Sequence, residues 1–226
     1  MSARGLFVTG TDTGVGKTRV AVALIQALRA RGLRVAAMKP VSAGHVPGEL
    51  NEDVLALLQA SNVSADVHDV NPYAFAEPIA PHIAAALAGA RIELDVIAAA
   101  YSRLAAVADV VVVEGAGGWR VPLNERQDMA DLAQRLGLPV VLVVGLRLGC
   151  LNHALLTAES IGCRRVPWAG WVGNHIEPAM PRAAENVASL HVRLPGPCLG
   201  VQRFLHEDVS PPKPPQWLTL PEALVS

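Results

Sequence analysis

The sequence predicts an α/β fold in which a doubly wound, mainly parallel sheet carries helices on both faces. Short apolar runs alternate along the chain with longer segments of helical periodicity. These runs are rich in branched residues and nearly continuous, which is typical of strands buried on both faces of a parallel sheet. The chain has 226 residues, of which 51% are hydrophobic and 17% charged. This length and composition fit a single domain over residues 1–226.

The apolar runs and the periodic segments follow one another in the order that such a fold requires. Strands are expected at residues 5–9, 34–39, 110–114, 140–144 and 169–172. Helices are expected at residues 17–31, 53–60, 94–106, 129–136, 152–161 and 182–190. Ligands bind outside the carboxyl ends of the strands in sheets of this kind, so a site is expected at that edge.

Two segments depart from the alternation. Residues 62–81 contain Asn-Pro-Tyr and Glu-Pro-Ile-Ala-Pro, so a largely irregular segment with a function is expected there. Residues 207–226 are rich in proline. They are expected to form a surface extension that leads to a last strand near residues 217–220.

Charge and cysteine content exclude several classes of protein. The net charge is −1 without a basic stripe, which argues against a nucleic-acid partner. The three cysteines, Cys150, Cys163 and Cys198, are widely spaced and fit a reducing compartment better than a disulfide framework or a zinc site. No run approaches the ~18 apolar residues of a membrane span, and the N-terminus lacks a secretory segment. A cytoplasmic protein without a membrane partner is therefore expected.

A phosphate-binding loop is the most informative motif. Residues 11–18 read Thr-Asp-Thr-Gly-Val-Gly-Lys-Thr and lie between a predicted strand and a predicted helix. Such a loop points backbone N–H groups at a phosphate, and the helix N-terminus adds partial positive charge. Lys17 is expected to reach the β- and γ-phosphates, and the Thr18 hydroxyl to bind Mg²⁺. The sequence therefore predicts a P-loop NTPase-like fold that binds a nucleoside triphosphate.

The loop departs from the common P-loop pattern, G-x-x-x-x-G-K-[ST]. That pattern needs glycine at position 11, whereas this chain has Thr11 and carries Gly10 one residue too early. The loop resembles instead the deviant P-loop group of ATPases and GTPases. That group usually has a second lysine where this chain has Asp12.

Three of the predicted strands end at or just before a polar residue: Lys39, Glu114 and Asn174. Glu114 is the expected partner of Mg²⁺, directly or through water. Two interpretations of Lys39 are open. It is either a cation that lies beside the phosphates or beside an acidic substrate, or a lysine whose side chain reaches solvent at the sheet edge. Asp53 is either a helix cap or a metal ligand. Residues 149–152, Gly-Cys-Leu-Asn, form either an anion site at a helix start or a tight connecting turn.

Taken together, these residues resemble the dethiobiotin synthetase family. Six segments carry the resemblance in the family's order, across residues 5 to about 175: 8–18, 39–41, 71–82, 113–119, 148–154 and 169–174. Segments 71–82 and 113–119 together are highly specific. The resemblance implies that 7,8-diaminopelargonic acid, CO₂ and MgATP give dethiobiotin, ADP and phosphate. The reaction would pass through a carbamate and a mixed carbamic–phosphoric anhydride.

The resemblance also implies a role for each matching residue. The catalytic residues would be Thr13, Lys17 and Lys39. The nucleotide would be bound by Asp12, Thr13, Gly14, Val15, Gly16, Lys17, Thr18 and Glu114, with Asn174 reading adenine. Mg²⁺ would be held by Thr18, Asp53 and Glu114. The substrate would be bound by Lys39, Ser42 and Gly117, and its carboxylate by Gly149, Cys150, Leu151 and Asn152 across a homodimer interface.

Three departures from the family pattern stand out. Gly14 occupies a position where many members have glutamate, and Ser42 is displaced by one residue from the family's usual serine. The sequence after Gly200 also differs. The alternative function is an ATP switch of the partitioning type, against which Asp12 argues. A nucleotide kinase would need an arginine-rich lid segment, which the sequence lacks.

Overall fold

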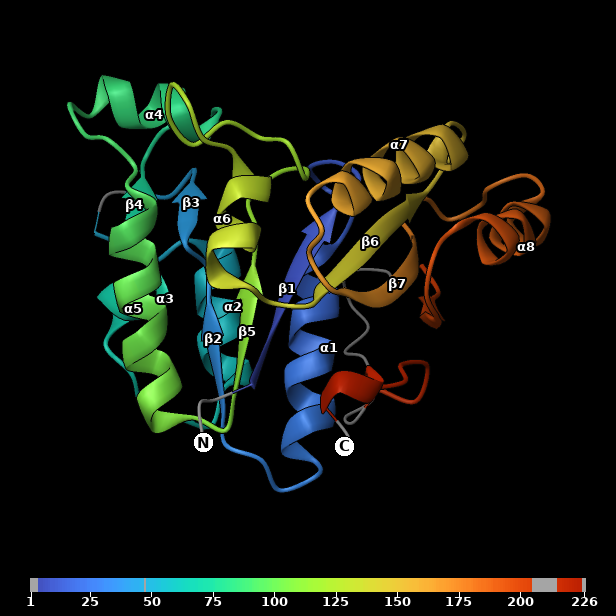
Figure 1. Ribbon diagram of the computed structural model, residues 1–226, viewed down its shortest axis with the longest axis horizontal. Coiled ribbons are helices and arrows are strands. Elements are labelled where there is room, and N and C mark those ends of the chain that lie inside the picture. The colour runs from blue at the N-terminus through green and yellow to red at the C-terminus, as the bar shows by residue number, and fades with distance from the viewer. Residues whose placement is uncertain (1–3, 47, 205–214, 225–226) are drawn as a thin grey trace.

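The computed structural model describes residues 4–46, 48–204 and 215–224. Its centre is a six-stranded sheet in the order β2-β5-β1-β6-β7-β8 (Figure 1). All strand pairs in the described residues are parallel. The strands of this sheet are β1 Arg4–Gly10, β2 Val35–Met38, β5 Val110–Glu114, β6 Val140–Leu146, β7 Trp168–His175 and β8 Cys198–Gln202. The sheet grows outward from β1 in both directions, which confirms the doubly wound α/β prediction.

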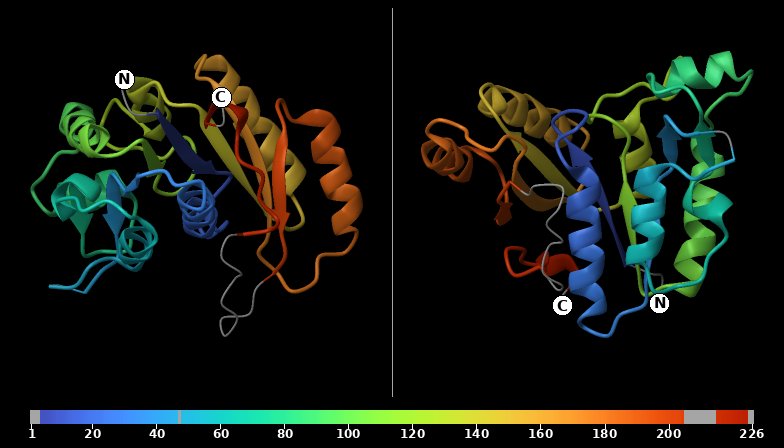
Figure 2. Two further views of the ribbon diagram at one scale, coloured as in Figure 1. Left: turned by 90° about the horizontal axis from the view of Figure 1, so that it is seen from below. Right: turned by 180° about the vertical axis from the view of Figure 1, so that it is seen from behind.

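Helices cover both faces of this sheet (Figures 1 and 2). The helices are α1 Lys17–Arg29, α2 Glu52–Ala60, α3 Val67–Val70, α4 Pro81–Leu87, α5 Leu94–Val107, α6 Met129–Leu136, α7 Cys150–Cys163 and α8 Ala183–Arg193. Alternate strand residues face opposite layers, as the period of a strand requires. Phe7 packs with residues of α5 to α8, whereas its neighbours Leu6 and Val8 pack with α1 and α2. The continuous apolar runs are therefore explained by burial on two faces.

The prediction of an irregular segment at residues 62–81 is partly wrong. The segment contains α3 and the strand β4, Tyr73–Phe75, which pairs in parallel with β3, Val41–Ala43. Both strands have three residues, too few for a clear periodic pattern in the sequence. This small second sheet lies beyond the carboxyl end of β2 (Figure 1), and its strand β3 lines the cavity described below.

The C-terminal part also differs from the prediction. The last strand is β8, and residues 217–220 form no strand. Pro215 and Pro221 flank that apolar run and lack the N–H group that a ladder needs. The run instead makes one ladder-like bond, from Thr219 N to Leu199 O at 2.7 Å, and Leu220 packs against the layer of α1. Residues 207–214, the first part of the predicted proline-rich extension, lie outside the described residues.

Two boundary differences affect the site. β7 continues past residue 172 to His175, so Asn174 lies within the strand. α7 begins at Cys150 with Gly149 as its N-cap, two residues before the predicted start. Within the described part of the chain, no helix has the length and apolar character to cross a bilayer.

Candidate active site

The phosphate-binding loop connects the end of β1 to the start of α1. Gly14 and Gly16 have φ angles of 73° and 88°, in the left-handed region that favours glycine. Gly16 is the N-cap of α1, and no side chain caps the described first turn. The loop therefore leaves the helix N-terminus open to an anion, as predicted.

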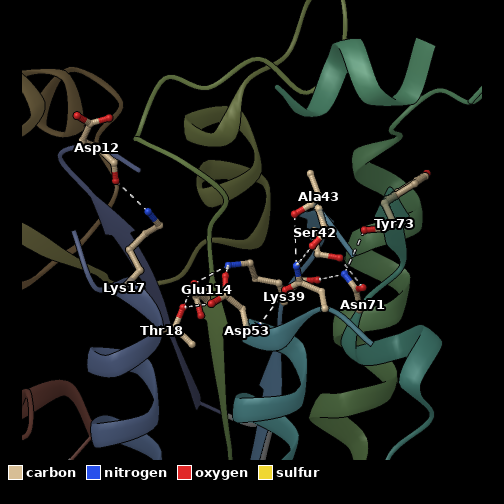
Figure 3. A network of polar contacts seen from close by, with 12 residues as sticks. Asp12, Lys17, Thr18, Lys39, Ser42, Ala43, Asp53, Asn71, Tyr73 and Glu114 are labelled. Atoms are coloured by element: carbon tan, nitrogen blue, oxygen red, sulfur yellow. Dashed lines mark hydrogen bonds and ion pairs between the residues drawn. The ribbon is translucent and has the colours of Figure 1, made fainter. Parts of the chain in front are cut away.

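Lys17 lies folded over this loop. Its side chain is buried, and Nζ donates a 2.9 Å hydrogen bond to the backbone oxygen of Asp12 (Figure 3). Burial, followed by the nearby charge of Lys39, lowers the pKa of Lys17 to about 8. A cation whose charge is this poorly solvated gains most when an anion arrives, which suits a phosphate contact.

Lys39 joins two carboxylates at the centre of the site (Figure 3). Its Nζ lies 2.7 Å from Asp53 Oδ2 and 2.5 Å from Glu114 Oε1. Burial alone would lower the pKa of Lys39, but Glu114 and Asp53 outweigh it and raise that pKa. Lys39 is only 5% exposed, so the alternative of a lysine reaching solvent is wrong.

Neighbouring elements explain how these charges meet. Lys39 directly follows β2, and Glu114 is the last residue of β5, the strand paired with β2. Asp53 lies in the first turn of α2, where Asn51 is the N-cap and accepts a bond from Asp53 N. The capping alternative for Asp53 is therefore wrong, because Asn51 has that role and the Asp53 carboxylate faces the site.

The two carboxylates differ in environment. Glu114 is fully buried, and burial raises its pKa despite the opposing charge of Lys39. Asp53 is half-exposed; burial tends to raise its pKa, but Lys39 and the Thr18 hydroxyl together lower it. The Thr18 Oγ1 atom lies 2.6 Å from Asp53 Oδ1 and 2.9 Å from Glu114 Oε1. Three oxygen-bearing side chains thus converge on one point.

The residues at this point fit the magnesium prediction. Mg²⁺ prefers oxygen ligands and commonly takes few of them from the protein, the rest coming from phosphates and water. Glu114 Oε2 is buried and has no hydrogen-bond partner among the described residues, so one carboxylate oxygen is available. In the described residues no group of three or more His, Cys, Asp or Glu side chains gathers. A cation here would therefore depend on Thr18 and on the nucleotide.

A cavity of about 770 Å³ opens over these groups. One wall is the phosphate loop with Thr13, Gly14, Gly16, Lys17 and Thr18. The lining also contains Lys39, Ser42, Asp53, Glu114 and Gly117. Residues 78–81, from the segment between β4 and α4, lie at its rim. The structure therefore brings most of the predicted site residues to one cavity.

Asn174 and residues 149–152 lie outside the cavity lining. Asn174 Nδ2 donates to Val15 O at 2.8 Å, so this side chain supports the phosphate loop from behind. Gly149 has a φ of 94° and is exposed, as is Asn152, whereas Cys150 is buried. No described side chain caps the start of α7. Its anion-binding role stays a prediction.

Sequence reasoning missed two residues near the site. Arg147, in the turn after β6, lies 2.7 Å from the Asp12 carboxylate and ties the phosphate loop to the start of α7. The only signal was a cation three residues after a predicted strand. Asn71 bonds to Ser42 and to the backbone of Lys39, and it lies in the segment predicted to be irregular.

Comparisons with known proteins identify the family. The ATP-dependent dethiobiotin synthetase BioD of Nitrosospira multiformis is 54% identical over 198 residues, which are 88% of this chain and 87% of the relative. The chain belongs to the dethiobiotin synthetase family. Its member from Aromatoleum aromaticum is 53% identical over 88% of this chain and 89% of its own length. The Pseudomonas aeruginosa member is 52% identical over 86% of this chain and 87% of its own length. The predicted resemblance is therefore confirmed.

Two further comparisons concern the fold. A family model described as an AAA domain matches residues 4–205. Among solved structures, the septum site-determining protein MinD of Pyrococcus horikoshii, complexed with Mg-ADP, has a TM-score of 0.55. It is 14% identical, and the likeness covers 89% of this chain and 81% of that chain. At this identity the likeness shows a shared P-loop fold and supports no ATP-switch function.

Proposed function

We propose that this chain catalyses the ATP-dependent carboxylation and ring closure of 7,8-diaminopelargonic acid with CO₂, giving dethiobiotin, ADP and phosphate. Membership in the dethiobiotin synthetase family supports the reaction. The structural observation that carries it is the second buried cation, Lys39, on a different strand from the phosphate loop. A simple ATPase needs only the loop lysine, whereas a reaction between two anions needs a cation between them.

The reaction has three steps that balance. One substrate amine attacks CO₂ and loses a proton, giving a carbamate. A carbamate oxygen then attacks the γ-phosphorus, and ADP leaves. The second amine attacks the carbamoyl carbon of this anhydride, expels phosphate and loses a proton to solvent, which closes the ring. Phosphorylation is needed because a carbamate is a poor electrophile with no adequate leaving group.

Positioning and charge neutralisation are the protein's part in this scheme. We assign Lys17 and Thr13 to the transferring phosphoryl group and Lys39 to the region between carbamate and γ-phosphate. The loop Asp12–Thr18 is assigned to the nucleotide phosphates, and Glu114 is assigned to the nucleotide as well. Asn174 is assigned to adenine through Oδ1, because its Nδ2 already donates to Val15 O. Ser42 and Gly117, which line the same cavity, are assigned to the diamine. Thr18, Asp53 and Glu114 would hold Mg²⁺, which neutralises phosphate charge when bound.

Product analysis tests the reaction. With ATP, magnesium, ¹⁴C-bicarbonate and diaminopelargonate, label should enter an acid-stable cyclic urea, with one ADP and one phosphate per ring. Leaving out the diamine or adding excess EDTA should stop ADP release. ADP formation at an equal rate without the diamine, or label that stays acid-labile, would favour the ATP-switch alternative.

We also propose a homodimer in which Gly149–Asn152 of one subunit bind the carboxylate of the substrate held by its partner. Three observations support this. The start of α7 presents an uncapped helix N-terminus among the described residues, and its residues lie outside the cavity of their own chain. Leu148, which precedes the N-cap of α7, and Leu156, in the middle of α7, are 94% and 58% exposed. An exposed apolar surface of this kind favours an isologous contact.

Mixing two inactive variants tests the shared site. Lys17→Ala disables the phosphate site, and Asn152→Asp places a negative charge where the carboxylate would bind while suiting a helix N-terminus. Because a mixed dimer restores one complete site, an equal mixture should recover about a quarter of wild-type activity. Sedimentation should give a dimer. A fully active monomer, or a mixture as inactive as its components, would rule out the shared site.

A cytoplasmic location is proposed as well. The support is that Cys150, Cys163 and Cys198 are all free thiols, which suits a reducing compartment.

A further inference from the structure

Asn71 is a buried amide that clamps the backbone next to Lys39 (Figure 3). Its Nδ2 donates to the backbone oxygens of Lys39 at 2.6 Å and Tyr73 at 3.1 Å. The backbone N–H of Lys39 also donates to Val70 O, at 2.7 Å. Both backbone polar groups of Lys39 are thus held by the two residues Val70 and Asn71. This matters because Pro40, which follows Lys39, has no N–H group with which to anchor the turn.

These bonds fix the orientation of the amide. Both partners of Nδ2 are carbonyl oxygens, which only accept, so the NH₂ group must face them. The Oδ1 atom therefore faces Ser42 Oγ, 2.8 Å away. Because Oδ1 only accepts, the single hydroxyl hydrogen of Ser42 must point at Asn71. Ser42 is 2% exposed and Asn71 8% exposed, so both side chains are buried.

We propose that Asn71 and Ser42 form a positioning pair that holds Lys39 in register with Asp53 and Glu114. In this arrangement Ser42 acts through Asn71 and donates nothing to the substrate. The pair fastens the turn between β2 and β3 to the start of β4, and the side chain of Lys39 extends from that turn to both carboxylates. The kinetic test of this inference rests on the proposed function. The inference replaces the predicted contact of Ser42 with the substrate by a contact of Ser42 with Asn71.

Five variants test the pair by activity. We expect Asn71→Ala to lower kcat about 10- to 100-fold while the KM for ATP changes less than about threefold, because misplacing a catalytic group costs rate more than nucleotide binding. Ser42→Ala should lower kcat without raising the KM for the diamine, and the double variant should be no slower than Asn71→Ala. Ser42→Thr keeps the hydroxyl and should retain more activity than Ser42→Val, which has the same size without it.

Asn124 provides a matched structural control. It is also a buried amide, 7% exposed, and donates to Ile92 O and Gln127 Oε1 away from the cavity lining. Asn124→Ala should lower the melting temperature while kcat of the folded protein stays within about twofold of wild type. The positioning pair is wrong if Asn71→Ala, like Asn124→Ala, lowers the melting temperature but leaves kcat within about twofold of wild type. It is also wrong if Ser42→Ala raises the KM for the diamine and if the losses of kcat in Ser42→Ala and Asn71→Ala multiply in the double variant.

A spectroscopic readout needs no substrate. The chain has three lysines, Lys17, Lys39 and Lys213, so ¹³Cε-lysine labelling gives three signals, which Lys→Arg variants assign. The Lys39 signal should shift in Asn71→Ala and in Ser42→Ala but not in Asn124→Ala. An unshifted signal overturns the pair even if the wild type proves inactive with diaminopelargonate. Failure of the pair and failure of the proposed function are therefore distinguishable.

Discussion

Replacing Lys17 with alanine should lower kcat/KM for ATP by about 10³-fold, a loss of about 4 kcal/mol of transition-state stabilisation. Lys17 is the cation at the start of α1, where the phosphate loop meets the helix N-terminus. Among the described residues, Lys17 Nζ donates a hydrogen bond only to a backbone oxygen of the loop, and burial lowers the pKa of Lys17. Its charge is therefore available to the γ-phosphate and is stabilised most when charge accumulates there.

The same environment predicts that Lys17→Ala stays folded. Removing a poorly solvated charge relieves a desolvation cost, so the melting temperature should not fall. The matched control is Arg31→Ala, which changes the net charge equally at an exposed position beyond the far end of α1. Steady-state kinetics and thermal unfolding, measured on the same preparations, show whether Lys17→Ala loses turnover while it stays folded. Near-normal turnover in Lys17→Ala would contradict the assignment of the phosphate site.

Replacing Lys39 with alanine should lower kcat by about 10²- to 10³-fold while the dissociation constant for ATP changes less than about threefold. Lys39 follows β2 and does not belong to the phosphate loop, but it lines the same cavity as that loop. A group in that place acts on charge that develops as carbamate and γ-phosphate combine. Isothermal titration gives the affinity, and single-turnover kinetics give the rate.

Lys39→Ala should also destabilise the protein. It removes the partner of the fully buried Glu114, and breaking a buried pair typically costs about 3–5 kcal/mol of unfolding free energy. Kinetics should therefore be measured at a temperature where circular dichroism shows a folded protein. Arg34→Ala is the matched control, because Arg34 precedes the same strand and its ion pair with Asp109 is largely exposed. Unchanged kcat with a raised ATP dissociation constant would mean that Lys39 only binds nucleotide.

The sequence by itself determined the main architecture and the phosphate site. Five of the six strands of the main sheet followed from continuous apolar runs, since parallel strands covered on both faces leave no polar alternation. The loop from Thr11 to Thr18 was recognisable because phosphate binding there depends on glycines and on a lysine at fixed local spacing. The local order of strand, loop and helix was enough for both predictions.

Only the tertiary structure decided which side chains meet. Lys39, Asp53 and Glu114 are separated by up to 75 residues in the chain, and their contacts depend on β2 pairing with β5. The strands β3 and β4 gave no periodic signal because each has only three residues. The edge strand β8 gave none because Gly200 interrupts its apolar run. The bonds of Asn71 to Ser42 and to Lys39 O could not be predicted, because hydrogen bonds of a buried amide depend on the three-dimensional position of its partners and not on their spacing in the sequence.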